Sequence, residues 1–189
     1  MISMTYARNL AHGHGLVWNA GGDRVEGYTN LLWTLYMGLV HLLPVATSKI
    51  CLVVQTTSAL LLLANLVFVR KLASTVSGGS RFASLGAVVM TAFYLPINNW
   101  SLQGMEVGLM ALLVTLAAWK ALEALERQRF SMWPYAVLAL AMLTRLDSAV
   151  VALALLVFLA TADRERRKRH LATGLILFGA AAAVQLGLS

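Results

Sequence analysis

Residues 50–69 read ICLVVQTTSALLLLANLVFV, twenty consecutive residues without a charged side chain. A helix of that length rises about 30 Å, which is the thickness of the hydrocarbon core of a bilayer. The composition of the whole chain agrees, because 59% of its 189 residues are hydrophobic and only 12% are charged, against about a quarter in soluble domains. We therefore predict an all-α, polytopic membrane helix bundle in which Ile50–Val69 is one span.

Apolar segments continue on the C-terminal side of this helix. We predict further spans over Phe82–Leu95, Glu106–Leu122 and Leu171–Ser189. Pro96–Gly104 is predicted to be an uncharged polar turn, because its proline cannot continue a helix. Residues 50–189 thus form a bundle of about six membrane segments, and residues 1–49 form a separate unit with an external loop and a juxtamembrane helix.

The segment Pro134–Ala160 is too long for one span. As a single helix its 27 residues would measure about 40 Å, and it carries Arg145 and Asp147 near its centre. Each charge costs about 2.5–3.5 kcal/mol at mid-membrane, and side chains two residues apart on a helix diverge, so they could not pair there. We predict two short helices that meet at Thr144–Ser148, with both charges in a protein-lined, hydrated cavity.

The basic residues are concentrated between the predicted spans. The net charge is +7, and eleven of the fifteen Lys and Arg residues lie in Arg70–Arg81, Lys120–Arg129 and Arg164–Arg169, which we predict to be loops. Short basic loops between spans are typical of the cytoplasmic side of membrane proteins. This placement argues against a nucleic-acid partner and in favour of membrane lipid. The single Cys51 excludes an internal disulfide framework.

The longest polar stretch is Tyr6–Asn30, YARNLAHGHGLVWNAGGDRVEGYTN. It lacks an apolar period, so we predict a loop preceded by a short helix over Ile2–His12 that ends at Gly13. The apolar segment Tyr28–Val45 follows, and its helical part would rise only about 22 Å. It either spans a thinned bilayer or lies on the outer leaflet. We favour the second option, which places the 6–30 loop on the outer face with Glu106, Arg145 and Asp147.

Three regions resemble one enzyme family: the 6–30 loop, Gly104–Glu106 and Leu143–Ser148. The chain is similar to GT-C membrane glycosyltransferases, in particular to bacterial relatives of protein mannosyltransferases, the lipid A aminoarabinose transferase and mycobacterial arabinofuranosyltransferases. The matching residues are Tyr6-Ala7-Arg8-Asn9, Gly13-His14-Gly15-Leu16-Val17, Val25-Glu26-Gly27-Tyr28-Thr29-Asn30, Gly104-Met105-Glu106 and Leu143-Thr144-Arg145-Leu146-Asp147-Ser148. The chain departs from the family at four positions, Thr5 in place of Arg, Val107 in place of Thr, Leu146 in place of Pro and Ser148 in place of Gly.

The resemblance implies transfer of a sugar from a polyprenyl-phosphate-linked donor to a cell-envelope glycan, lipid or protein acceptor at the outer face of the bacterial cytoplasmic membrane. The family's base is a carboxylate that would lie upstream of Met1, so we expect a fragment that is inactive alone and has no catalytic residue of its own. Arg145 is expected to bind the lipid phosphate. The candidate substrate-binding residues are His14, Glu26, Tyr28, Asn30, Glu106, Arg145 and Asp147.

Other interpretations of these residues remain open. Glu106 and Asp147 could simply cap helices, and Arg145 could make a structural bond to Glu106 or to loop carbonyls. We expect no cofactor and no bound metal, since His12 and His14 alone are too few ligands. An alternative function is a non-catalytic membrane subunit or a transporter with Arg145 and Asp147 in an ion or proton path.

Overall fold

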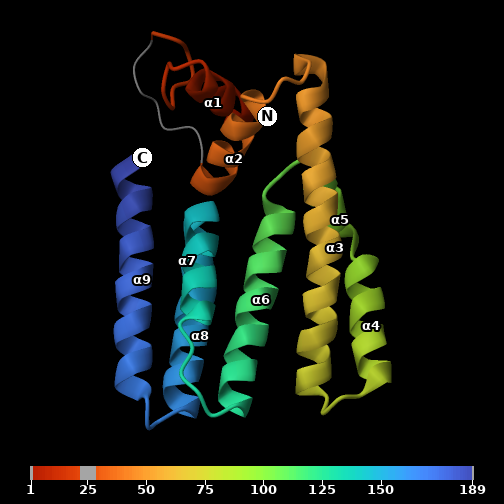
Figure 1. Ribbon diagram of the computed structural model, residues 1–189, viewed down its shortest axis with the longest axis vertical. Coiled ribbons are helices and arrows are strands. Elements are labelled where there is room, and N and C mark those ends of the chain that lie inside the picture. The colour runs from red at the N-terminus through yellow and green to blue at the C-terminus, as the bar shows by residue number, and fades with distance from the viewer. Residues whose placement is uncertain (1, 22–28, 189) are drawn as a thin grey trace.

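The computed structural model describes residues 2–21 and 29–188. All regular structure in these residues is helical, which confirms the predicted all-α class (Figure 1). The elements in chain order are α1 (Ile2–Ala11), α2 (Leu31–His41), η1 (Thr47–Lys49), α3 (Ile50–Val76), α4 (Arg81–Ala92), α5 (Leu95–Leu102), α6 (Val107–Glu126), α7 (Trp133–Thr144), η2 (Leu146–Ser148), α8 (Ala149–Ala162) and α9 (Arg167–Leu188).

The long helices stand side by side, and the short α1 and α2 cover one end of them (Figure 1). α3 packs on α6 and α4, α6 packs on α7, and α9 packs on α7 and α8. Within the described residues, Thr47–Val76, Val107–Glu126 and Arg167–Gly187 are long and apolar enough to cross a membrane. The pair α4–α5, bent by 49°, would make a fourth span, whereas α2, α7 and α8 are shorter apolar helices.

All three predicted basic loops are partly helical, so their predicted boundaries were wrong, and α9 begins at Arg167 within the third. α3 continues through Arg70 and Lys71, and α6 continues through Lys120. The Nζ atom of Lys71 lies 4.5 Å from the ring centre of Trp119, and that of Lys120 lies 2.8 Å from a carboxylate oxygen of Glu123. Cation–π and ion-pair contacts therefore hold these side chains along the helices, which end only after them.

The predicted polar turn at Pro96–Gly104 is also wrong, because most of it forms the helix α5. Pro96 occupies the first turn of α5, where its missing N–H group costs no helical hydrogen bond. α5 ends before Gly104, which has a φ of +85°. That left-handed conformation is unstrained in glycine and turns the chain sharply toward the start of α6.

The predicted break in Pro134–Ala160 is confirmed. α7 ends at Thr144, and Arg145 has an extended backbone with φ −152° and ψ 128°. The single turn η2 and the helix α8 then continue the chain. Because Arg145 is not helical, its side chain and that of Asp147 can point toward each other, which the geometry of a straight helix would have prevented.

A series of buried hydrogen bonds joins α7 to α9 at the end of the bundle opposite α1 and α2. The Nε2–H group of His170, which is 2% exposed, donates to an Asp163 carboxylate oxygen at 3.2 Å, and its Nδ1 lies 2.5 Å from the Tyr135 hydroxyl. Burial acts to raise the pKa of Asp163, but hydrogen bonds from Arg166 and His170 outweigh it and hold that pKa below its usual value. The resulting stabilisation is present at neutral pH and is lost on acidification below the ordinary carboxyl range.

Candidate functional site

Glu106 is the buried centre of the candidate site. Its side chain, only 3% exposed, lies at the residue before α6, where the sharp turn at Gly104 directs it inward. One carboxylate oxygen accepts a hydrogen bond from Nδ2 of Asn30 at 2.8 Å. The other accepts from a terminal guanidinium nitrogen of Arg145 at 3.0 Å. A buried carboxylate without such partners would be very costly, so these contacts hold the site together.

Arg145 joins Glu106 to a second carboxylate. Its Nε lies 3.1 and 3.2 Å from the two oxygens of Asp147, and its other terminal nitrogen lies 2.9 Å from one of them. The side chain of Asp147 is 63% exposed and that of Arg145 is 38% exposed. The guanidinium thus has a buried carboxylate on one edge and a solvated carboxylate on the other, and the three groups together carry a formal charge of −1.

Asn30 connects the site to the N-terminal helices. It immediately precedes α2, and its side-chain oxygen accepts from the hydroxyl groups of Ser3, at 2.8 Å, and Thr34, at 3.0 Å. These two donors fix the orientation of the amide, so that its nitrogen must face Glu106. The predicted site residue Asn30 therefore meets the predicted site residues Glu106, Arg145 and Asp147 in one cluster, which we call the Glu106 cluster.

Two supporting residues escaped the sequence analysis. The indole nitrogen of Trp33 donates to the carbonyl oxygen of Gly104 at 2.9 Å and so ties α2 to the turn before Glu106. Ser3 contributes the bond to Asn30 described above. Neither residue belongs to the motifs that carry the family resemblance, and both partners lie far away in the sequence. No local pattern could have identified them.

The other predicted site residues are not in the cluster. His14 is exposed, and within the described residues its side chain makes no hydrogen bond to the Glu106 cluster. Glu26 and Tyr28 lie outside the described residues. Among the described residues, neither Glu106, which occupies the N-cap position of α6, nor Asp147 makes a side-chain capping hydrogen bond. The structural bond from Arg145 to Glu106, by contrast, is present.

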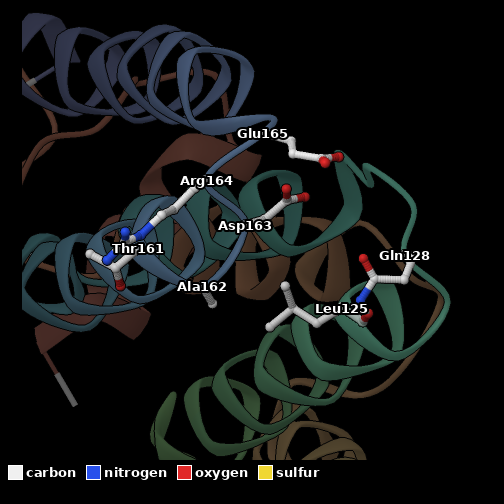
Figure 2. A pocket seen from close by; sticks show the side chains of 7 residues that line it. All are labelled: Leu125, Gln128, Thr161, Ala162, Asp163, Arg164 and Glu165. Atoms are coloured by element: carbon white, nitrogen blue, oxygen red, sulfur yellow. Dashed lines mark hydrogen bonds between the residues drawn. The ribbon is translucent and has the colours of Figure 1, made fainter.

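The cluster and the basic segments lie at opposite ends of the bundle. Glu106 and Arg145 precede α6 and follow α7 at the end covered by α2, whereas the α3–α4, α6–α7 and α8–α9 connections lie at the other end (Figure 1). A cavity of about 350 Å³ opens at that second end, and Asp163, Arg164 and Glu165 line it (Figure 2). Among the described residues no group of three His, Cys, Asp or Glu side chains is placed to hold a metal ion.

Comparison with known proteins gives one match. The family model described as dolichyl-phosphate-mannose-protein mannosyltransferase matches residues 39–186, which include three members of the Glu106 cluster. No curated protein and no solved structure matches the chain.

Proposed function

Because the chain belongs to the dolichyl-phosphate-mannose-protein mannosyltransferase family, a family of GT-C-type membrane glycosyltransferases, we propose that it binds a polyprenyl-phosphate-linked sugar. The sugar would pass to a cell-envelope glycan, lipid or protein at the outer face of a bacterial cytoplasmic membrane. We assign the Glu106 cluster to the donor.

The edge of Arg145 that faces Asp147 carries this proposal. Nε of Arg145 bonds one oxygen of the Asp147 carboxylate and a terminal nitrogen bonds the other, which is the two-pronged geometry that Arg also uses for phosphate. Asp147 is well exposed, and an exposed ion pair is worth only about 0–1 kcal/mol, so it is easily displaced. Glu106 is buried and remains in place to orient the guanidinium. Asp147 thus occupies the position that we assign to the lipid phosphate, and once displaced it is free to accept from a sugar hydroxyl.

The cluster is suited to binding rather than to proton removal. Glu106 is buried and accepts hydrogen bonds from Asn30 and Arg145, and Asp147, once displaced by the phosphate, is assigned to a hydroxyl of the donor sugar, so neither is assigned to take a proton from an acceptor hydroxyl. We propose that the base is a carboxylate outside the described residues and that this chain contributes donor binding.

If the Glu106 cluster binds the donor phosphate, two substitutions should change the affinity for polyprenyl phosphate in opposite directions. In detergent, Arg145→Gln is expected to weaken binding of a short polyprenyl phosphate by about tenfold or more, since charge-assisted bonds are lost. Asp147→Asn is expected to strengthen binding, because it removes the competing anion. Titration calorimetry measures both, with the exposed Lys49→Gln as a control of equal charge change. Unchanged affinity in Arg145→Gln, or weaker binding in Asp147→Asn, would contradict the assignment of the lipid phosphate to this edge of Arg145.

The proposed orientation predicts which residues are reachable from outside the cell. His14 and Arg129 are exposed in the loops at opposite ends of the bundle. In a Cys51→Ser background, an impermeant thiol reagent is expected to label His14→Cys in intact cells and to label Arg129→Cys only after lysis. The reverse pattern would place the Glu106 cluster on the cytoplasmic side and contradict transfer at the outer face.

A further inference from the structure

A second polar cavity lies at the far end of α2 from the Glu106 cluster. It has a volume of about 240 Å³ and is bounded by α1, the end of α2 and the start of α3. Its polar lining consists of Thr5, Arg8, His41 and Thr47. The eleven residues of α2 rise about 16 Å. Asn30 precedes the first of these residues and His41 is the last, so the two sites are well separated.

The polar groups of this cavity are all able to donate hydrogen bonds. In the described part of the chain, no hydrogen bond or ion pair engages the guanidinium of Arg8 or the hydroxyls of Thr5 and Thr47. Nδ1 of His41 lies 2.7 Å from the carbonyl oxygen of Met37 and must carry its hydrogen there, so Nε2 donates only in the imidazolium form, which a bound anion would favour. Among the described residues, no carboxylate lines the cavity. The cavity therefore presents positive charge and hydroxyl donors without an anion.

Helix dipoles explain only part of this arrangement. Arg8 lies in the last turn of α1 and His41 in the last turn of α2, where a positive charge is favourable by about 0.3–1 kcal/mol. That effect requires only that each residue be near its own helix end. It does not account for both side chains lining one hollow with Thr5 and Thr47. An anion that contacts all four groups does account for it.

The surroundings of the cavity indicate the depth at which this anion lies. Leu39 and Leu42 are each 64% exposed at the same end of α2, and Leu43 is 49% exposed. Exposed leucines at the end of a short helix on top of a membrane bundle are suited to contact with acyl chains. Their charged neighbours then lie at the level of the lipid headgroups.

We propose that the cavity formed by Thr5, Arg8, His41 and Thr47 binds the phosphate group of a phospholipid headgroup. Arg8 would donate two N–H groups to the phosphate, and the hydroxyls of Thr5 and Thr47 would donate to its remaining oxygens. The acyl chains would lie along Leu39 and Leu42. Such a lipid would anchor the α1–α2 unit to the bilayer surface. The proposal does not depend on the chain being a transferase.

Calorimetry with the whole chain in detergent can test this site. The probes are dihexanoylphosphatidylglycerol, inorganic phosphate and farnesyl phosphate. We expect the first to bind most tightly, and Arg8→Gln to weaken its binding about tenfold or more. His41→Asn keeps a donor for the Met37 carbonyl but removes Nε2, so a loss of about two- to fivefold is expected. Lys49→Gln is the matched control, because Lys49 is exposed nearby but does not line the cavity.

The outcomes separate the possible ligands. Equal losses in Arg8→Gln and Lys49→Gln would show nonspecific attraction to anions and overturn the site. Equal or tighter binding of inorganic phosphate would overturn the lipid assignment in favour of a free anion. Tighter binding of farnesyl phosphate that Arg8→Gln weakens and Arg145→Gln does not would assign the cavity to the sugar carrier and overturn the phospholipid. Circular dichroism checks that the helix content of the Arg8→Gln variant is unchanged. The His41→Asn variant tests the same cavity through a different side chain.

Discussion

Replacing Arg145 with methionine is expected to lower the free energy of unfolding by about 2–3 kcal/mol. The substitution leaves Glu106, whose side chain is 3% exposed, with a charge that only Asn30 hydrogen-bonds within residues 2–21 and 29–188. Removal of one partner from a fully buried ion pair costs about 3–5 kcal/mol. We expect less here because 38% of the Arg145 side chain is exposed, so that water screens part of the pair.

A second substitution separates the cost of the unpaired Glu106 charge from a general loss of folding stability. In the double variant Glu106→Gln/Arg145→Met the buried charge is gone, and we expect most of the lost stability to return while polyprenyl phosphate binding does not. Arg129→Met, an exposed change at the other end, should alter stability by less than about 0.5 kcal/mol. Denaturation in mild detergent, followed by circular dichroism, measures all three. Additive losses in the double variant would mean that Arg145 and Glu106 are not energetically coupled.

Turnover by the 189-residue chain alone is expected to be about 10²–10⁴-fold below that of a family member with a free catalytic carboxylate. The reason lies in the cluster itself, where Arg145 engages both Glu106 and Asp147. Glu106 stays in its buried ion pair, and Asp147 is assigned to the donor sugar once the phosphate displaces it, so neither carboxylate is assigned to deprotonate an acceptor.

The measurement uses purified chain in nanodiscs with labelled polyprenyl-phosphate sugars and a panel of acceptors. If a missing base causes the low rate, added formate or acetate should raise turnover, because a small carboxylate can enter the open side of the cluster. A rate that equals that of an active relative and disappears in Glu106→Gln would identify Glu106 as the base and contradict the proposed division of roles.

The sequence predicted the break at Arg145 but not what the break permits. Excess length and the cost of two charges in a membrane were sufficient to infer two helices in Pro134–Ala160. The bond between Arg145 and Asp147 depends on the extended backbone at Arg145, with φ −152°, which no helical pattern specifies. For the same reason the competition between Asp147 and a phosphate could be proposed only from the structure.

Contacts between distant segments were the other limit of prediction. The resemblance placed Asn30 and Glu106 among the site residues, but their direct bond joins positions 76 residues apart. The bond between Trp33 and Gly104, 71 residues apart, could not be predicted either, because Trp33 belongs to none of the matched motifs. Helix ends were predicted wrongly where charges were taken as signs of a loop, as at Lys71. The rings of Phe68 in the same helix and Trp119 in α6 stabilise this charge within the helix.

The bond from Asn30 to Glu106 has a consequence for the order of events at the ribosome. The α1–α2 unit cannot reach its final contacts until Glu106 and Arg145 have been made, and Arg145 follows Asn30 by 115 positions. At about 5–20 residues per second, synthesis takes about 6–23 s to cover that interval. During this time α1 and α2 cannot make their contacts with Glu106. A nascent chain arrested before residue 106 should therefore be cleaved faster by added protease between residues 2 and 21 than a chain arrested after residue 148.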